Sequence, residues 1–178
     1  CSLNGTCQLG LLPAPTSLTS PGNSTPGQAD GSRIDRTVTI GPGDLPAGSI
    51  ISDVDIAIEF EKTDQTDCAT PYGDTNPFNE EIVFYLTSPG GTRVVLVENS
   101  ADWGGSGLGP TYPILPKYGG RVLVTFDDAA ATLVGGHMPE SGTFRPVQPL
   151  AALIGEDPFG TWTLTAGDSA IGQALCLA

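Results

Sequence analysis

The fold is decided within residues 53–60, where the chain reads Asp53-Val54-Asp55-Ile56-Ala57-Ile58-Glu59-Phe60. Every second residue of this stretch is a large apolar one, and the residues between are acidic or small. Successive side chains of an extended strand point to opposite faces of a sheet. The alternation therefore predicts a strand with one face on a hydrophobic core and the other in water. Residues 34–40 repeat it, with Ile34, Arg36, Val38 and Ile40 on one side and polar residues on the other.

Other segments are apolar on both sides, which is typical of central strands. They are residues 82–87 and 94–97, and residues 121–126 and 161–166 follow the same rule. The turn residues Ser88-Pro89-Gly90-Gly91 between the first two predict a hairpin. Short strands separated by Gly and Pro turns, without a convincing amphipathic helix, predict an all-β fold. We expect a jelly-roll β-barrel or sandwich of about eight strands.

The strand pattern also predicts where the domain begins. Residues 1–32 have no apolar period and are rich in Pro, Ser, Thr and Gly, which indicates a linker or the tail of a preceding module. Residues 33–178 form the predicted β domain. The chain starts at Cys1 rather than Met, so we expect it to be an excised piece of a larger precursor. Residues 61–79 and 99–120 are predicted long loops, and such loops usually have a function.

The charge balance excludes several classes of partner. The 178 residues include 7 Lys and Arg against 20 Asp and Glu, a formal net charge of −13. Nucleic acids and anionic membrane surfaces need clustered basic residues, so neither is an expected partner. The longest apolar runs are far shorter than the roughly 20 residues of a transmembrane helix, so membrane insertion is not expected either. An acidic chain suits divalent cations.

Four cysteines indicate an oxidising compartment. Cys1, Cys7, Cys68 and Cys176 form no CxxC pair and share the chain with one His, which disfavours a zinc site. In a Lys-poor, Pro-rich chain they favour disulfides and a secreted or cell-surface location. Three pairings are possible, of which we favour Cys1–Cys7 as a small ring and Cys68–Cys176 as a long-range link. Four unpaired, buried thiols are the alternative.

No catalytic constellation is recognisable. His137 is the only His and lies in a Gly-rich turn context, and no G-x-S-x-G occurs. A serine hydrolase needs a base and an orienting carboxylate beside its serine. Some pair among the 20 acids will match glycosidase spacing by chance, but carboxylates on strands are mostly solubilising. We therefore expect no covalent chemistry from this chain and no catalytic residue in it.

Structural calcium is the one cofactor that the residues suggest. Asp74, Asn76, Asn79 and Glu81 place hard oxygen ligands at loop spacing before a predicted strand. Asp127-Asp128 follows one strand and Asp168 follows another. The candidate metal ligands are thus Asp74, Asn76, Glu81, Asp127 and Asp168. An equally weighted interpretation is that these loop acids and amides cap turns.

Four segments resemble a known family when taken together. Residues 86–92 read Leu-Thr-Ser-Pro-Gly-Gly-Thr, and residues 126–128 read Phe-Asp-Asp. Residues 142–150 hold Gly-Thr-Phe-Arg-Pro followed by Pro-Leu, and residues 155–164 read Gly-Glu-Asp-Pro-Phe-Gly-Thr-Trp-Thr-Leu, with Asp168 beyond. In this order and spacing, from Ile34 to the end, they resemble the P domain (P/Homo B domain) of subtilisin-like proprotein convertases, in its bacterial form.

The resemblance implies a β jelly roll, similar to the galactose-binding domains, that is non-catalytic. Such a domain packs beside a secreted subtilisin-like serine protease and supports its folding, or belongs to a bacterial surface protein. It also implies calcium at Glu81 and Asp168, with Glu81 in place of the family's Asp. The chain departs from the family at residues 61–79, an apparent insertion that carries Cys68, and in an incomplete closing motif.

The expected partner is therefore an adjacent domain of the same polypeptide. A different interpretation is a carbohydrate-binding jelly roll of a surface protein. Its ligand-binding residues would be Trp103, Tyr112 and Tyr118, whose rings could stack on a glycan from a Gly- and Pro-rich loop. The same rings could equally pack that loop down. A purely structural or adhesive surface segment is a third possibility.

Overall fold

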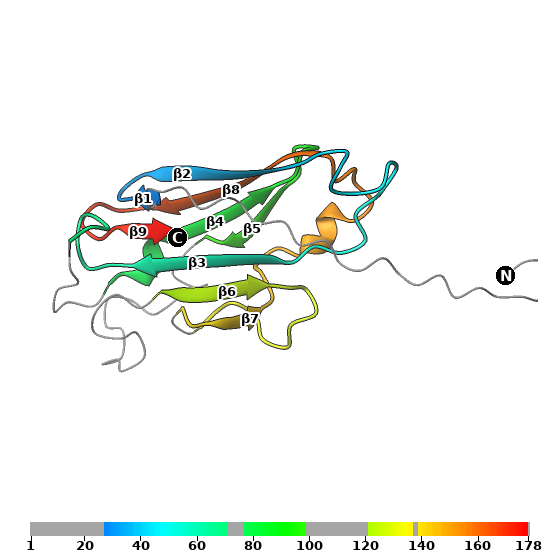
Figure 1. Ribbon diagram of the computed structural model, residues 1–178. Helices are drawn as coiled ribbons and strands as arrows, with labels where there is room; N and C mark the ends of the chain where they lie inside the picture. The colour runs from blue at the N-terminus through cyan, green and yellow to red at the C-terminus, as the bar shows by residue number, and fades with distance from the viewer. Residues whose placement is uncertain (1–26, 71–76, 99–120, 137–138, 178) are drawn as a thin grey trace, which may run out of the picture.

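The chain folds into strands joined by loops and two single-turn 3₁₀ helices. The computed structural model describes residues 27–70, 77–98, 121–136 and 139–177, and every structural statement below concerns these residues (Figure 1). The strands are β1 (Gly27–Ala29), β2 (Arg33–Ile40), β3 (Ile56–Lys62), β4 (Ile82–Thr87), β5 (Arg93–Val97), β6 (Val122–Phe126), β7 (Gly142–Phe144), β8 (Gly160–Asp168) and β9 (Leu175–Leu177). The short helices are η1 (Asn79–Glu81) and η2 (Leu150–Leu153). None of the described helices is long and apolar enough to cross a membrane.

Two sheets face each other as a β-sandwich. Sheet A has the strand order β1-β9-β3-β6-β7, and sheet B has the order β2-β8-β4-β5. Figure 1 shows sheet B as one layer above β3, β6 and β7 of sheet A. The strands pair antiparallel except β6 and β7, which are parallel. The predicted all-β fold is confirmed.

The core lies between the sheets and follows the alternation of the strands. In β3, Ile58 and Phe60 are buried while Ala57 and Glu59 are exposed, as residues 53–60 predict. Phe60 meets Phe84 of sheet B edge to face, with ring centroids 5.1 Å apart. The burial of these apolar side chains between the sheets is the main favourable contribution to folding.

One strand lies elsewhere in its sheet than the sequence suggests. The apolar character of β5 predicts a central strand, but β5 is the edge strand of sheet B. A loop covers that edge, because the backbone N–H groups of Val147 and Gln148 donate to the carbonyls of Leu96 (3.1 Å) and Val95 (2.9 Å). The covering loop keeps the strand buried and its edge satisfied, so β5 resembles a central strand in sequence.

The sandwich begins before the predicted boundary at residue 33. Gly27 to Ala29 form β1, which pairs antiparallel with β9 from Leu175 to Leu177. The side chain of Gln28 then clamps the loop after β3, since Nε2 donates to the carbonyl of Thr66 (2.9 Å) and Oε1 accepts the N–H of Cys68 (3.1 Å). Three residues are too few to show a period, and the partner strand lies at the far end of the described chain.

A side chain at Gly160 is expected to destabilise the fold. This glycine opens β8 with φ of 123°, and an added Cβ would lie 2.8 Å from Cβ of Pro89. Gly160→Ala should therefore lower the free energy of unfolding by about 2 kcal/mol, from backbone strain and crowding. Gly43→Ala is the matched control, because nothing lies within 4 Å of its added Cβ. Equal urea midpoints for the two variants would contradict this prediction.

Candidate functional site

A buried lysine joins the two sheets at one end of the sandwich. Lys62 is the last residue of β3 and is 2% exposed. Its Nζ donates to Oε2 of Glu81 at 2.9 Å, to Oδ2 of Asp168 and to the backbone carbonyl of Gln173. We call these four residues, Lys62, Glu81, Asp168 and Gln173, the ammonium cage.

Strand pairing brings the two carboxylates together. Ile82, the first residue of β4, pairs with Asp168, the last residue of β8. Glu81 directly precedes Ile82 and closes η1, so both acids lie at the same end of sheet B. Lys62 belongs to sheet A, where it pairs with Leu175 of β9. Its ammonium therefore links the sheets across the sandwich.

The pKa of one acid in the cage, Asp168, is shifted by its surroundings. Burial raises the pKa of Asp168 to about 6, although the hydrogen bond and positive charge of Lys62 oppose that rise. The nearby charge of Glu81 raises the same pKa further. The other oxygen of Asp168, Oδ1, accepts the N–H of Ala170 at 3.2 Å. At neutral pH the cage thus holds an ion pair whose carboxylate is held largely out of water.

Calcium does not fit the pair of acids that the resemblance assigns to it. Glu81 and Asp168 are both bonded to Lys62, and a dication beside the ammonium would be repelled. Asp127 cannot join them, because it follows Phe126, which pairs with Ile56 at the other end of β3 from Lys62. Six strand residues span about 20 Å.

The other candidate ligands do not complete a metal site in the described chain. Asp74 and Asn76 lie outside the described residues. Asn79 is 4% exposed, and its Oδ1 has no hydrogen-bond partner in the described structure. No group of three or more His, Cys, Asp or Glu within the described ranges is arranged to hold a metal.

Asp168 gives stability a definite pH dependence. Its pKa is raised in the folded state, so its contribution is complete below the unfolded value near 3.8 and is lost as pH rises through about 6. The difference in unfolding free energy between wild type and Asp168→Asn should therefore grow by about 1 kcal/mol in favour of wild type from pH 8 to pH 5. Urea unfolding at four pH values measures it. A pH-independent difference would contradict the raised pKa.

Asp127 and Asp128 hold loops in the described structure. Asp128 accepts the N–H of Leu150 (3.0 Å) and of Ala151 (2.7 Å), which fixes the start of η2. Oδ1 of Asp127 accepts the N–H of Ala129 at 2.6 Å in the turn after β6. Both carboxylates thus accept backbone N–H groups of loops or turns.

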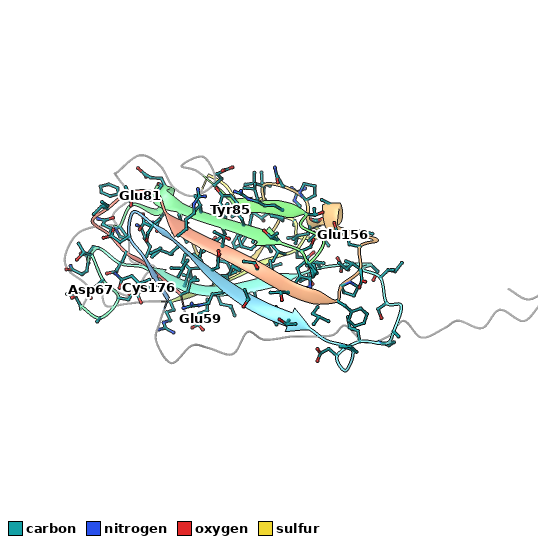
Figure 2. The ribbon with its side chains drawn as sticks, turned by 90° about the horizontal axis from the view of Figure 1, so that it is seen from above. Glu59, Asp67, Glu81, Tyr85, Glu156 and Cys176 are labelled. Atoms are coloured by element: carbon teal, nitrogen blue, oxygen red, sulfur yellow. A yellow bond between two sulfur atoms is a disulfide. The ribbon has the colours of Figure 1, made fainter. Side chains whose placement is uncertain are left out.

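Glu156 fastens the β4–β5 hairpin to the loop before β8. Ser88 Oγ donates to Glu156 Oε2 at 2.6 Å, and Thr92 Oγ1 donates to Oε1. These hydrogen bonds lower the pKa of Glu156. Figure 2, which looks onto sheet B, places Glu156 toward the opposite end of the sandwich from Glu81 and Cys176.

The long-range disulfide is present as favoured. Cys68 and Cys176 are bonded, with their Cα atoms 5.8 Å apart. The bond ties the loop after β3 to β9, because Cys176 pairs with Glu61 in sheet A. Cys1 and Cys7 lie outside the described residues, as do His137, Trp103, Tyr112 and Tyr118.

Sequence reasoning missed Lys62 and Glu156 as site residues. Lys62 continues the inward phase of Ile56, Ile58 and Phe60, and a lysine in that phase signals a buried charge that needs a partner. Glu156 lies inside the fourth motif, but the sequence alone gives no partner for its carboxylate. A scan against protein-family models and a search of curated proteins both find no match for the chain.

Proposed function

We propose that this chain is a non-catalytic accessory module, similar to a P domain, that stabilises or positions a neighbouring domain of the same polypeptide. A subtilisin-like serine protease is the first candidate for that neighbour. One observation supports this most: several polar side chains of the motif segments, Ser88, Thr92, Asp127, Asp128 and Glu156, are hydrogen-bonded to one another or to backbone. Side chains used in this way support an architectural role.

Hydrogen bonds connect the motif segments in pairs. Glu156 of the fourth motif accepts hydrogen bonds from Ser88 and Thr92 of the first. Asp128 of the second motif accepts the N–H groups of Leu150 and Ala151, at the end of the third. The backbone N–H of Asp127 also donates to the carbonyl of Phe144 at 3.0 Å. Hydrogen bonds thus fasten the first motif to the fourth and the second motif to the third.

An extracytoplasmic location accompanies the proposal. The Cys68–Cys176 disulfide is compatible with an oxidising compartment. A net charge of −13 keeps an exported module soluble, and it suits neither nucleic acid nor an anionic membrane.

The test is made in the full-length parent polypeptide. Deleting residues 27–178 should reduce the soluble yield and the folded fraction of the neighbouring domain, measured by limited proteolysis and by that domain's own activity. A matched variant carries only Gly43→Ala in the module and should behave as wild type. Unchanged folding and activity after the deletion would overturn the proposal.

The isolated chain provides a second test. It should turn over no peptide, ester or glycoside substrate above the uncatalysed rate. Turnover that survives repurification and is lost in a single-residue variant would show a catalytic centre, and the accessory role would then be insufficient.

A further inference from the structure

Within the described residues, the ammonium cage offers three oxygen acceptors to the ammonium of one lysine. A lysine ammonium carries three N–H donors and no acceptor. The cage supplies three oxygens, from Glu81, Asp168 and the carbonyl of Gln173. Glu81 lies in one segment, Asp168 and Gln173 lie together in a second, and Lys62 lies in a third, so the site is built by the tertiary fold.

A buried charge in this position requires such surroundings. Taking a lysine out of water costs several kcal/mol unless it is paired and hydrogen-bonded. The side chain of Lys62 is 1% exposed and that of Asp168 is 0% exposed, whereas Glu81 retains 17%. Within the described residues the two carboxylates make the surroundings of this position negative, and the ammonium of Lys62 is the cation that occupies it.

The choice of cation follows from coordination. Calcium takes six to eight oxygens at about 2.3–2.6 Å. The three oxygens of the described residues are already bonded to an ammonium, whose fixed positive charge stands where a metal ion would lie. The resemblance implies calcium here, so the residues of this chain depart from what the family implies.

We infer that the ammonium of Lys62 is the built-in cation of this site, and that the module binds no divalent ion at Glu81 and Asp168 while Lys62 is present. The lysine side chain thus takes the place of a metal ion that could dissociate. This end of the sandwich is therefore held together without a bound metal. Removing the side chain vacates a site whose chemistry accepts a small alkylammonium ion.

The first experiment vacates the cage with Lys62→Ala and refills it. Breaking a buried ion pair on one side should lower Tm by about 10 °C. Propylammonium has the atoms that the variant lacks beyond Cβ, and at ten times its dissociation constant it should raise the variant's Tm by about 4 °C. 1-Propanol, which has the same carbon chain without the charge, is the control and should not raise the variant's Tm. Wild type should respond to neither.

The second experiment asks whether wild type binds calcium at these acids. Tm of wild type and of Glu81→Gln is measured in chelator and in millimolar calcium chloride. The same calcium response in both proteins, including none, is the expected result, since it places no ion at Glu81. A calcium-dependent rise in wild type that Glu81→Gln abolishes would overturn the inference.

The two experiments fail independently. A Lys62→Ala protein that propylammonium does not stabilise, or that 1-propanol stabilises equally, would show that the cage is not a cation site. If Lys62→Ala does not fold, the comparison of wild type with Glu81→Gln still decides the question.

Discussion

Removing the Cys68–Cys176 disulfide is expected to lower the free energy of unfolding by about 4 kcal/mol. The bond closes a loop of 108 residues, and the loss of unfolded-state entropy from a loop of about 100 residues corresponds to roughly 4.7 kcal/mol. It also links β9 to the loop after β3, so its loss frees the strand that pairs with β1. Alanine is the better replacement, because Cys176 is 6% exposed and a buried serine would add an unpaired hydroxyl.

The measurement is urea unfolding of Cys68→Ala/Cys176→Ala. It is made in a Cys1→Ser/Cys7→Ser background, so that no new thiol pairing forms, and the background alone is the control. A reducing agent should shift the background protein toward the double variant and leave the double variant unchanged. A difference below about 1 kcal/mol would show that the bond constrains little in the unfolded chain.

Truncating Phe84 should destabilise the sandwich by a similar amount. Phe84 is 0% exposed in the centre of sheet B and meets Phe60 of sheet A, so Phe84→Ala removes contact between the two layers. Large-to-small changes of buried phenylalanine cost about 3–5 kcal/mol through lost burial and the cavity left behind. Ile50→Ala is the control, because Ile50 is 69% exposed and its truncation should change little.

A double-mutant cycle with Phe60→Ala separates the aromatic contact from the cavities. The coupling between the two rings should be about 1 kcal/mol. Equal losses for Phe84→Ala and Ile50→Ala would mean that the two sheets do not share this core.

The strongest long-range links gather at one end of the molecule. The disulfide, the ammonium cage and the Gln28 clamp all lie around the end of β3, where β1 and β9 pair. At the other end, Glu156 and Asp128 hold the loops of the four motifs. Both ends are thus fastened by covalent, ionic or charge-assisted contacts, as a module that supports a neighbouring domain would need.

The sequence by itself determined six of the nine described strands, all except β1, β7 and β9. Alternation in residues 34–40 and 53–60, and the apolar runs behind β4, β5, β6 and β8, are local signals, because the side-chain direction of a strand has a period of two. The turn at Ser88 to Gly91 and the pairing of Cys68 with Cys176 were also within reach of sequence reasoning.

Only the tertiary structure decided which distant residues meet. β5 lies at an edge of sheet B that a loop much later in the chain covers, and β1 is a strand because β9 pairs with it. Glu81 and Asp168 lie 19 and 106 residues from Lys62 in the sequence, yet both belong to the ammonium cage. Such contacts depend on strand order and register, which no local period encodes, and so the same acids that suggest calcium in the sequence bind an ammonium in the fold.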